Sequence, residues 1–283
     1  MALDYNVENV IEVDHLWYTY MPMGFTALKD ISLTIKRGEF LAIIGQNGSG
    51  KTTLIKHFIG LHKATQGEVR ICGKTLTKDD KVSDLAQSIG YVFQNPSHQI
   101  FADTVGTEVA FGPKNIGFTD AQVAEAVTEA LEDVGLSEFR DESPVVLGRG
   151  QLQRLAIASI LSMKPKILII DEPTTGLDWR ECVKVMNVVK RLNEAGHTII
   201  MTTHNMNLVS LYAKRAIVLR LGEKLLDGPV DEVFSQTEIL HSAYIKAPQV
   251  YRLLDGIDAI KPVDYTIDNV AGAIVSAMRE GTN

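Results

Sequence analysis

The stretch Gly45-Gln-Asn-Gly-Ser-Gly-Lys51-Thr52 decides the fold of this chain. It matches G-x-x-x-x-G-K followed by Ser or Thr, the pattern of the phosphate-binding P-loop, in which glycines let several backbone N–H groups point at one anion. The apolar run Phe40–Ile44 before it predicts a buried strand, and the apolar positions from Leu54 to Ile59 after it predict a helix. Strand, loop and helix together predict a site for nucleotide phosphates.

Each part of the loop has a chemical role in this interpretation. Lys51 holds the β- and γ-phosphates, and the hydroxyl of Thr52 coordinates Mg²⁺. The positive end of the following helix adds to the attraction for anions. We therefore expect ATP and Mg²⁺ here. The residues expected to contact the nucleotide are Gly45, Asn47, Gly48, Ser49, Gly50, Lys51, Thr52 and Thr53.

Composition limits the classes of protein that this chain resembles. Its 283 residues, 45% hydrophobic and 22% charged, predict one large globular domain or one domain with a smaller appendage. A net charge of −7 gives no sign of a broad nucleic-acid surface. No apolar stretch approaches the ~18 residues that span a bilayer, and no signal peptide is expected. Cys72 and Cys182 fit neither a metal site nor a disulfide framework. We expect a cytoplasmic protein that could dock on a membrane partner.

The texture of the chain predicts an α/β fold. Strand-like and helical segments alternate, which is typical of a parallel sheet with crossover helices. After Pro229 the pattern becomes less regular and predicts a small region of short helices. The expected strands are 9–44 (several, with turns at 21–24 and 36–38), 68–71, 89–93, 166–170 and 197–202, and the expected helices are 119–134, 150–163 and 179–193.

A second phosphate-chemistry motif follows the P-loop. The apolar strand Ile167–Ile170 ends in Asp171 and Glu172, which is a Walker B pattern. Asp171 is expected to hold Mg²⁺, directly or through water, and Glu172 to orient and polarise the attacking water. Phosphoryl transfer depends mostly on positioning and charge neutralisation, so a lysine, a metal and a water-orienting acid form a sufficient set.

Four further pieces appear in a fixed order: Gln94 after the strand 90–93, Leu147–Gln151 at the start of a helix, Gly176-Leu-Asp178, and His204 after a strand. With these motifs the chain resembles the ATP-binding cassette (ABC) ATPases over about residues 8–228. The resemblance implies an α/β P-loop NTPase fold with an antiparallel β subdomain, a helical subdomain at about 95–163, and a small C-terminal extension at 229–283.

The resemblance also implies roles for single residues. Tyr20, or with less support Tyr18, stacks on adenine. Gln94 touches Mg²⁺ or water and senses the γ-phosphate. Asp178 lies at the interface between two copies, and His204 reaches the γ-phosphate. Catalysis is thus expected from Glu172, His204, Gln94 and Lys51, and metal binding from Thr52, Gln94 and Asp171.

The signature motif, Leu147–Gln151, departs from the family pattern Leu-Ser-Gly-Gly-Gln, because Gly148 replaces the serine and Arg149 the first glycine. In the family this motif meets the nucleotide bound on the opposite subunit. Gly150 and Gln151 remain as expected contacts at a helix N-terminus. Arg149 adds positive charge there or points to solvent, and we favour solvent because a bulky residue must avoid the nucleotide. A homodimer has two altered sites and a heterodimer one; our hypothesis is a heterodimer with one weakened site.

The segments 91–105 and 108–113 and the tail at 231–235 and 248–250 look like those of energy-coupling factor (ECF) importers, which take up vitamins and transition-metal ions. The resemblance implies a second ABC ATPase, a transmembrane coupling subunit and a substrate-binding membrane subunit as partners, at the cytoplasmic face of the membrane, with no nucleic acid. The tail is expected to hold the two ATPases together. Phe93, Pro96, Ile100 and Phe101 either receive a coupling helix or, for Phe93 and Ile100, pack in the core.

Other functions fit less well. Another class of ABC transporter is the nearest alternative. A soluble ABC ATPase acting on ribosomes usually carries two cassettes, whereas this chain has one P-loop. DNA-repair members carry a long coiled-coil or zinc insertion, and the interval 94–147 is short and without cysteines. A purely structural nucleotide-binding module would not need Glu172 and His204.

Overall fold

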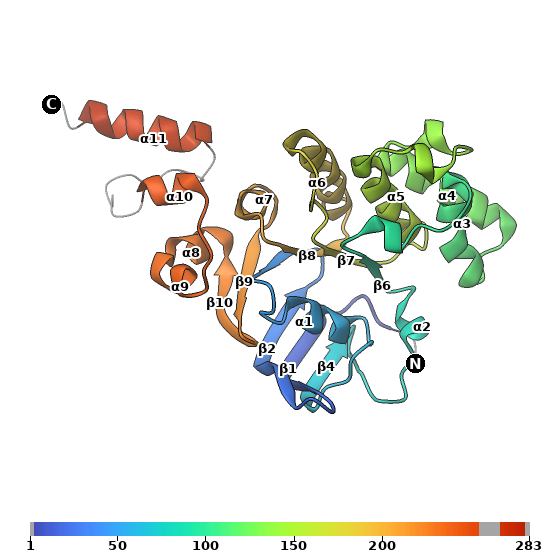
Figure 1. The fold of residues 1–283 in the computed structure, drawn as a ribbon, viewed down its shortest axis with the longest axis horizontal. Coiled ribbons are helices and arrows are strands. Elements are labelled where there is room, and N and C mark those ends of the chain that lie inside the picture. The colour runs from blue at the N-terminus through green and yellow to red at the C-terminus, as the bar shows by residue number, and fades with distance from the viewer. Residues whose placement is uncertain (1–2, 255–266, 281–283) are drawn as a thin grey trace.

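Two β-sheets form the centre of the molecule, with helices packed around them (Figure 1). The computed structural model describes residues 3–254 and 267–280. The strands are β1 (Asn9–Tyr20), β2 (Phe25–Lys36), β3 (Phe40–Ile44), β4 (Gln66–Ile71), β5 (Lys74–Thr75), β6 (Ile89–Val92), β7 (Ile167–Asp171), β8 (Thr198–Thr203), β9 (Arg215–Arg220) and β10 (Glu223–Pro229). The α-helices are α1 (Lys51–Phe58), α2 (Val82–Leu85), α3 (Val105–Asn115), α4 (Asp120–Val134), α5 (Arg149–Leu161), α6 (Trp179–Glu194), α7 (Met206–Tyr212), α8 (Val230–Ser235), α9 (Thr237–Ser242), α10 (Gln249–Leu254) and α11 (Ile267–Glu280), and the 3₁₀ helices are η1 (Pro96–His98), η2 (Ser137–Phe139) and η3 (Pro144–Val146).

The larger sheet positions the candidate site. Its six strands run in the order β10-β9-β3-β8-β7-β6, and all neighbouring pairs except β10–β9 are parallel. Every residue of β3, β7 and β8 is buried, because helices or the second sheet cover both faces of these strands. Burial on both faces explains why these strands read as continuous apolar runs. The predicted α/β fold is confirmed.

The smaller sheet is antiparallel, in the order β2-β1-β4-β5. Strands β1 and β2 each contain 12 residues, so they are longer than the short strands that the sequence suggested. Register shifts interrupt their pairing at several points, including between Val13 and Leu16. Such irregularities bend and twist a strand pair. The expected antiparallel β part of the ABC fold is thus present.

Three apolar clusters hold the layers together. The first lies between the large sheet and helices α3–α6, and the second lies between the two sheets and around α1. The third joins β3 and β9 to α7 and to the terminal helices α8–α10. Strand β3 contributes to the last two in alternation, with Leu41 and Ile43 in the second cluster and Ala42 and Ile44 in the third. The strand that leads into the P-loop is therefore fixed from two sides.

Some elements differ from the expectation. Helix α3 was not expected, since Gly112 and Pro113 lie within its last turn and weaken the helical pattern. The β9–β10 hairpin was also not expected. Helix α11 has 14 residues and is longer than the short helices predicted for the tail. Residues 255–266 and 281–283 of the predicted extension lie outside the described residues.

Candidate functional site

The predicted site residues gather at one edge of the large sheet. The P-loop follows β3, Gln94 lies two residues after β6, Glu172 follows β7, and His204 follows β8. These strands are parallel, so their carboxyl ends meet at the same edge, where ligands of open α/β sheets bind. Residues far apart in the chain are thereby brought together.

The P-loop is closely packed at its first residue. A Cβ atom at Gly45 would lie 2.4 Å from the carbonyl oxygen of Leu219 and 2.5 Å from Oγ of Ser49, so only glycine fits. Oγ of Ser49 is buried and has no hydrogen-bond partner within the described parts of the chain. An unpaired buried hydroxyl is costly, and a phosphate oxygen is a ligand that would satisfy it.

Lys51 extends into the loop. Its ammonium donates hydrogen bonds to the carbonyl oxygens of Gly45 at 2.8 Å and Gln46 at 3.0 Å. Burial lowers the pKa of Lys51, while the nearby carboxylates of Glu172 and Asp171 act to raise it. A partly desolvated cation at a helix N-terminus attracts anions more strongly than one in bulk water. The loop is therefore suited to the phosphates expected there.

Two hydrogen-bond donors and the His204 ring converge on one oxygen of Glu172. Nε2 of Gln94 lies 3.0 Å from Oε2 of Glu172, Oγ1 of Thr175 lies 3.0 Å from it, and Nδ1 of His204 lies 3.3 Å from it. The Glu172 backbone has φ 47, a conformation unusual for a residue other than glycine. Its N–H donates to the carbonyl oxygen of Thr202 at 3.0 Å, which holds this turn against β8. The carboxylate is thus fixed in direction.

Asp171 is held by two hydroxyl groups. The side chain of Thr202 donates to Oδ1, and the Tyr91 hydroxyl donates to Oδ2 at 3.0 Å. Burial and the charge of Asp171 raise the pKa of Tyr91, which keeps this hydroxyl protonated as a donor. Neither Thr202 nor Tyr91 was singled out from the sequence. A threonine at the buried end of an apolar strand was the available signal.

An aromatic cluster surrounds Tyr20. Its hydroxyl lies 3.2 Å from Oγ1 of Thr53 and 3.3 Å from Nε2 of His62. The Tyr18 ring meets Tyr20 edge-on at 4.9 Å and stacks on His62 at 4.7 Å. The His57 ring also meets Tyr18 edge-on, at 4.7 Å. Because His62 occupies a face of Tyr18, this arrangement favours Tyr20 over Tyr18 as the adenine contact.

The signature residues lie around the turn between β7 and α6. Gly148 precedes α5, and its N–H donates to Oε1 of Gln151 at 2.8 Å. Asp178 caps α6 by accepting from the Glu181 N–H at 2.9 Å. Gly150 is buried, whereas Arg149 is exposed and contacts Gly176. Within the described residues no hydrogen bond joins Gly150, Gln151 or Asp178 to the P-loop.

The residues expected to hold Mg²⁺ offer oxygen atoms only. They are the hydroxyl of Thr52, the amide oxygen of Gln94 and the carboxylate of Asp171. In residues 3–254 and 267–280 no group of three or more His, Cys, Asp or Glu side chains could hold a metal. Mg²⁺ binds through oxygen ligands, usually one or two carboxylates together with phosphates and water. The donor chemistry therefore suits the expected ion.

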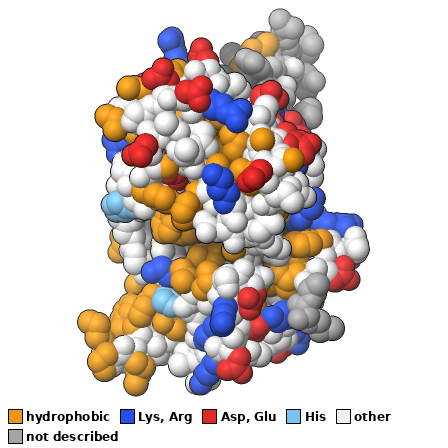
Figure 2. All heavy atoms as spheres, turned by 90° about the vertical axis from the view of Figure 1, so that its right-hand side faces the viewer, with side chains coloured by type: hydrophobic (Ala, Val, Ile, Leu, Met, Phe, Trp, Pro, Cys, Tyr) orange, Lys and Arg blue, Asp and Glu red, His pale blue; other side chains and the backbone are white. Residues whose placement is uncertain are grey.

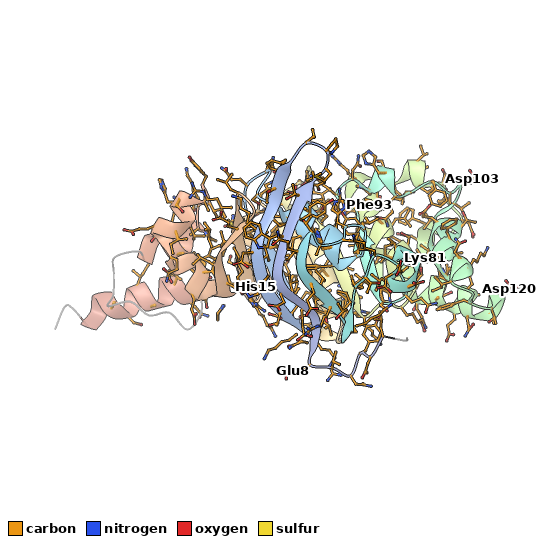
Figure 3. All side chains as sticks on the ribbon, turned by 90° about the horizontal axis from the view of Figure 1, so that it is seen from below. Glu8, His15, Lys81, Phe93, Asp103 and Asp120 are labelled. Atoms are coloured by element: carbon orange, nitrogen blue, oxygen red, sulfur yellow. The ribbon has the colours of Figure 1, made fainter. Side chains whose placement is uncertain are left out.

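An apolar hollow lies between α2, α3 and α5, and its lining includes Gln99 and Phe101 of the segment after Gln94. Figure 2 shows several groups of hydrophobic side chains on the face that lies to the right in Figure 1, and Figure 3 shows Phe93 between the strands and helices α3–α5. Phe101 and Phe111, exposed by 65% and 50%, meet edge-on in a cavity of about 540 Å³. Of the other expected contacts, Phe93 is exposed, Pro96 is buried, and Ile100 packs against the first apolar cluster. Of the four residues expected to contact a coupling helix, Phe93 and Phe101 are therefore exposed. Phe111 is also exposed, and the sequence analysis did not single it out.

No helix among the described residues is long and apolar enough to cross a membrane. Both cysteines are free and buried, which agrees with reduced thiols. Burial raises the pKa of the Cys72 thiol to about 11.

Comparison with known proteins adds independent findings. The ABC transporter profile matches residues 28–175. The chain is 40% identical over 276 residues to the energy-coupling factor transporter ATP-binding protein EcfA of Methanocaldococcus jannaschii, covering 96% of this chain and 99% of that protein. A relative from Caldanaerobacter subterraneus subsp. tengcongensis is 48% identical over 244 residues, but the chain spans only 42% of its length.

Solved structures show the same similarity. Clostridium perfringens cbiO1, described as part of the ABC transporter complex cbiONQ, superposes with a TM-score of 0.78 at 36% identity, covering 88% of this chain and 99% of that one. A dimeric ATP-binding cassette in a post-hydrolysis state with ADP and Pi superposes with a TM-score of 0.68 at 31% identity, covering 78% of this chain and 98% of that one.

Proposed function

The chain belongs to the ABC transporter family as an ATP-hydrolysing subunit of the energy-coupling factor type, and we propose that it drives a membrane importer of vitamins or transition-metal ions. The observation that carries the proposal is the convergence of Gln94, Thr175 and His204 on Oε2 of Glu172, beside the Lys51 ammonium. A carboxylate held in this way is suited to orienting one water molecule at a phosphate.

The proposed mechanism assigns one task to each group. Lys51 and the N–H groups at the start of α1 bind the terminal phosphates, and Ser49 offers its unpaired hydroxyl to the same ligand. Glu172 accepts a hydrogen bond from the attacking water and fixes its direction, while His204 lies on the same carboxylate oxygen. Mg²⁺ held by Thr52, Gln94 and Asp171 would neutralise the negative charge on the phosphates.

A second subunit completes the proposed unit. Gly45 and Gln46 of the P-loop line a cavity of about 700 Å³ together with residues 204–207, 244–249 and 252. The P-loop and the terminal segment therefore border the same cavity. A paired subunit that covered this cavity would contact both. ATP would then act as a ligand that favours the closed pair, and hydrolysis would remove that preference.

The membrane partner is assigned to the hollow between α2, α3 and α5. Phe101 and Phe111 line it and meet edge-on, and both rings are exposed. An apolar hollow with exposed aromatic rings fits one face of an amphipathic helix. A coupling helix of an integral membrane subunit placed here would contact Phe101, which lies on the segment that follows Gln94. We place the chain at the cytoplasmic face of the membrane on this basis.

Co-purification tests the proposal. The tagged chain, extracted from membranes in mild detergent, is expected to bring down an integral membrane subunit and to hydrolyse ATP. Lys51→Ala should retain the membrane subunit but bind ATP about 10- to 100-fold more weakly, because a charge-assisted contact is lost. A wild-type chain recovered without membrane proteins and bound to ribosomes would overturn the proposal.

The heterodimer hypothesis has its own test. Glu172→Gln chains are mixed with each co-purifying ATPase subunit, and ATP hydrolysis is measured. A heterodimer should lose only the turnover of the site that contains this chain's Glu172. Isolation of a stoichiometric homodimer of this chain alone, with equal loss at both sites, would contradict the hypothesis.

A further inference from the structure

We propose that Arg149 is a positioning residue that ties the signature motif to the turn after β7 and so couples the two nucleotide sites of the paired assembly. The inference rests on the proposed function, in which the signature of this chain meets the nucleotide of the opposite subunit. Arg149 is exposed, in line with the favoured expectation, and its guanidinium also contacts Gly176 of the same chain, which the sequence did not predict.

The contact between Arg149 and Gly176 is close. Nη1 of Arg149 donates to the Gly176 carbonyl oxygen over 3.4 Å. A Cβ atom at Gly176 would lie 2.5 Å from Nη1 and 2.7 Å from Cζ, so the planar guanidinium covers the glycine. Gly176 has φ 74, which other residues adopt with strain. The turn is therefore shaped to accept this side chain.

A second contact joins the same two segments. A Cβ atom at Gly150 would lie 2.1 Å from Oε2 of Glu181, so the Glu181 side chain lies directly against the start of α5. The Glu181 N–H in turn donates to Oδ1 of Asp178. We call the Arg149–Gly176 and Gly150–Glu181 contacts the clasp. The clasp packs the start of α5 against the start of α6.

The clasp continues to the site of this chain. Thr175, the neighbour of Gly176, donates from Oγ1 to Oε2 of Glu172 at 3.0 Å, and its N–H donates to the Glu172 carbonyl oxygen at 3.3 Å. Thr175 in this turn thus contacts Glu172, which belongs to the nucleotide site of this chain. Gly176, the next residue, contacts Arg149 of the signature motif, which belongs to the nucleotide site of the opposite subunit. A shift at Arg149 therefore moves the hydrogen-bond partner of Glu172.

The residue type supports positioning over simple charge. Arginine presents a rigid planar fork that covers a glycine and reaches a carbonyl oxygen at once, whereas the lysine ammonium is a compact charge on a flexible stem. A lysine would preserve the charge at the signature but lose the planar contact. If Arg149 acted only by placing a positive charge near the opposite phosphate, lysine would replace it.

The test measures cooperativity in ATP hydrolysis by the complex as isolated. The variants are Arg149→Ala, Arg149→Lys, Thr175→Val and the double variant Arg149→Ala with Thr175→Val. Arg180→Ala, in the exposed first turn of α6, is the matched control. Melting temperatures verify folding, and the Kd for ATP of each variant is measured separately.

We expect a wild-type Hill coefficient above 1 that falls to about 1 in all four test variants, with the Kd for ATP changed less than about twofold. The double variant should be no worse than the stronger single variant, because both changes cut the same connection. Full rescue by Arg149→Lys, additive losses in the double variant, or a wild-type Hill coefficient of 1 would overturn the inference. A wild-type complex that hydrolyses no ATP would instead refute the proposed function and, with it, the inference.

Discussion

Nε2 of Gln94 donates to Oε2 of Glu172 over 3.0 Å, so a residue just beyond β6 directly holds the carboxylate that follows β7. The two strands are parallel neighbours in the sheet. Gln94 also begins the segment that leads to the exposed rings of Phe101 and Phe111. A partner that displaces this segment would therefore act on Glu172 through one hydrogen bond, without any change in the P-loop.

Replacing Glu172 by glutamine should separate ATP binding from hydrolysis. The amide keeps the shape of the side chain but cannot polarise water as a carboxylate does. We expect kcat for ATP hydrolysis to fall by about 10²- to 10⁴-fold, with the Kd for ATP changed less than about threefold. Steady-state hydrolysis and equilibrium ATP binding provide the measurements. Glu138→Gln, at an exposed position, is the control, and wild-type turnover in Glu172→Gln would remove Glu172 from its role.

Substitution of Tyr20 should weaken recognition of adenine. Loss of a stacking ring costs about 1–3 kcal/mol, so Tyr20→Ala should raise the Kd for ATP by roughly 5- to 150-fold. Tyr20→Phe keeps the ring and loses only the contacts of the hydroxyl with Thr53 and His62, and its Kd should stay within about threefold of wild type. A larger loss in Tyr18→Ala than in Tyr20→Ala would show that the adenine contact was assigned to the wrong tyrosine.

Polar substitutions in the hollow should impair membrane docking. The double variant Phe101→Ser with Phe111→Ser removes two exposed rings, and we expect at least about tenfold less membrane subunit in co-purification, because buried aromatic anchors dominate interfaces. ATP binding to the purified chain should not change. Val145→Ser is the control, since Val145 is 90% exposed but lies outside this cavity lining. Equal recovery of the membrane subunit with both proteins would place the docking surface elsewhere.

His57 should make folding stability depend on pH. Burial lowers its pKa from 6.5 to about 4, so below pH 6.5 the unfolded chain binds a proton that the folded protein does not. Stability from this group is complete above pH 6.5 and decreases as the pH falls toward 4. Between pH 7 and pH 5 the loss should be about 2 kcal/mol.

Urea unfolding of His57→Gln at both pH values checks this expectation. The variant should lose less stability on acidification than the wild type, by about the same 2 kcal/mol. His241→Gln, on the exposed side of α9, should lose as much as the wild type. Identical losses in all three proteins would show that His57 does not control the acid sensitivity. His62 and His197 also have pKa values lowered by burial, so part of the sensitivity should remain.

The sequence was most informative where local pattern alone determines structure. The glycine spacing from Gly45 to Gly50 and the apolar runs of β3, β7 and β8 predicted the loop and its strands, because each follows from a few adjacent residues. The approach of Thr202 and Tyr91 to Asp171 depends on the strand order β6-β7-β8, which no local pattern contains. The same holds for Thr175, whose hydroxyl meets Glu172 only through the shape of the turn.

Arg149 shows the limit from another side. The sequence suggested two positions for its side chain, near the phosphate of the opposite subunit or in solvent. The exposed guanidinium also covers Gly176, and that glycine lies 27 residues farther along the chain. Only the approach of α5 to the start of α6 brings them into contact. The family motifs could be recognised from adjacent residues. The role of a residue that departs from a motif, such as Arg149, depends on long-range packing that the sequence does not show.

The third apolar cluster gives the end of the chain an unexpected importance. Ile44, the residue before the P-loop, belongs to the same cluster as Phe234 and Leu240 of the terminal helices. These helices therefore pack against β3, the strand that leads into the P-loop. A protein shortened after Pro229 would expose the apolar side chains on this face of β3 to water. The terminal helices thus contribute to the rigidity of the P-loop through packing alone, without contacting the phosphates themselves.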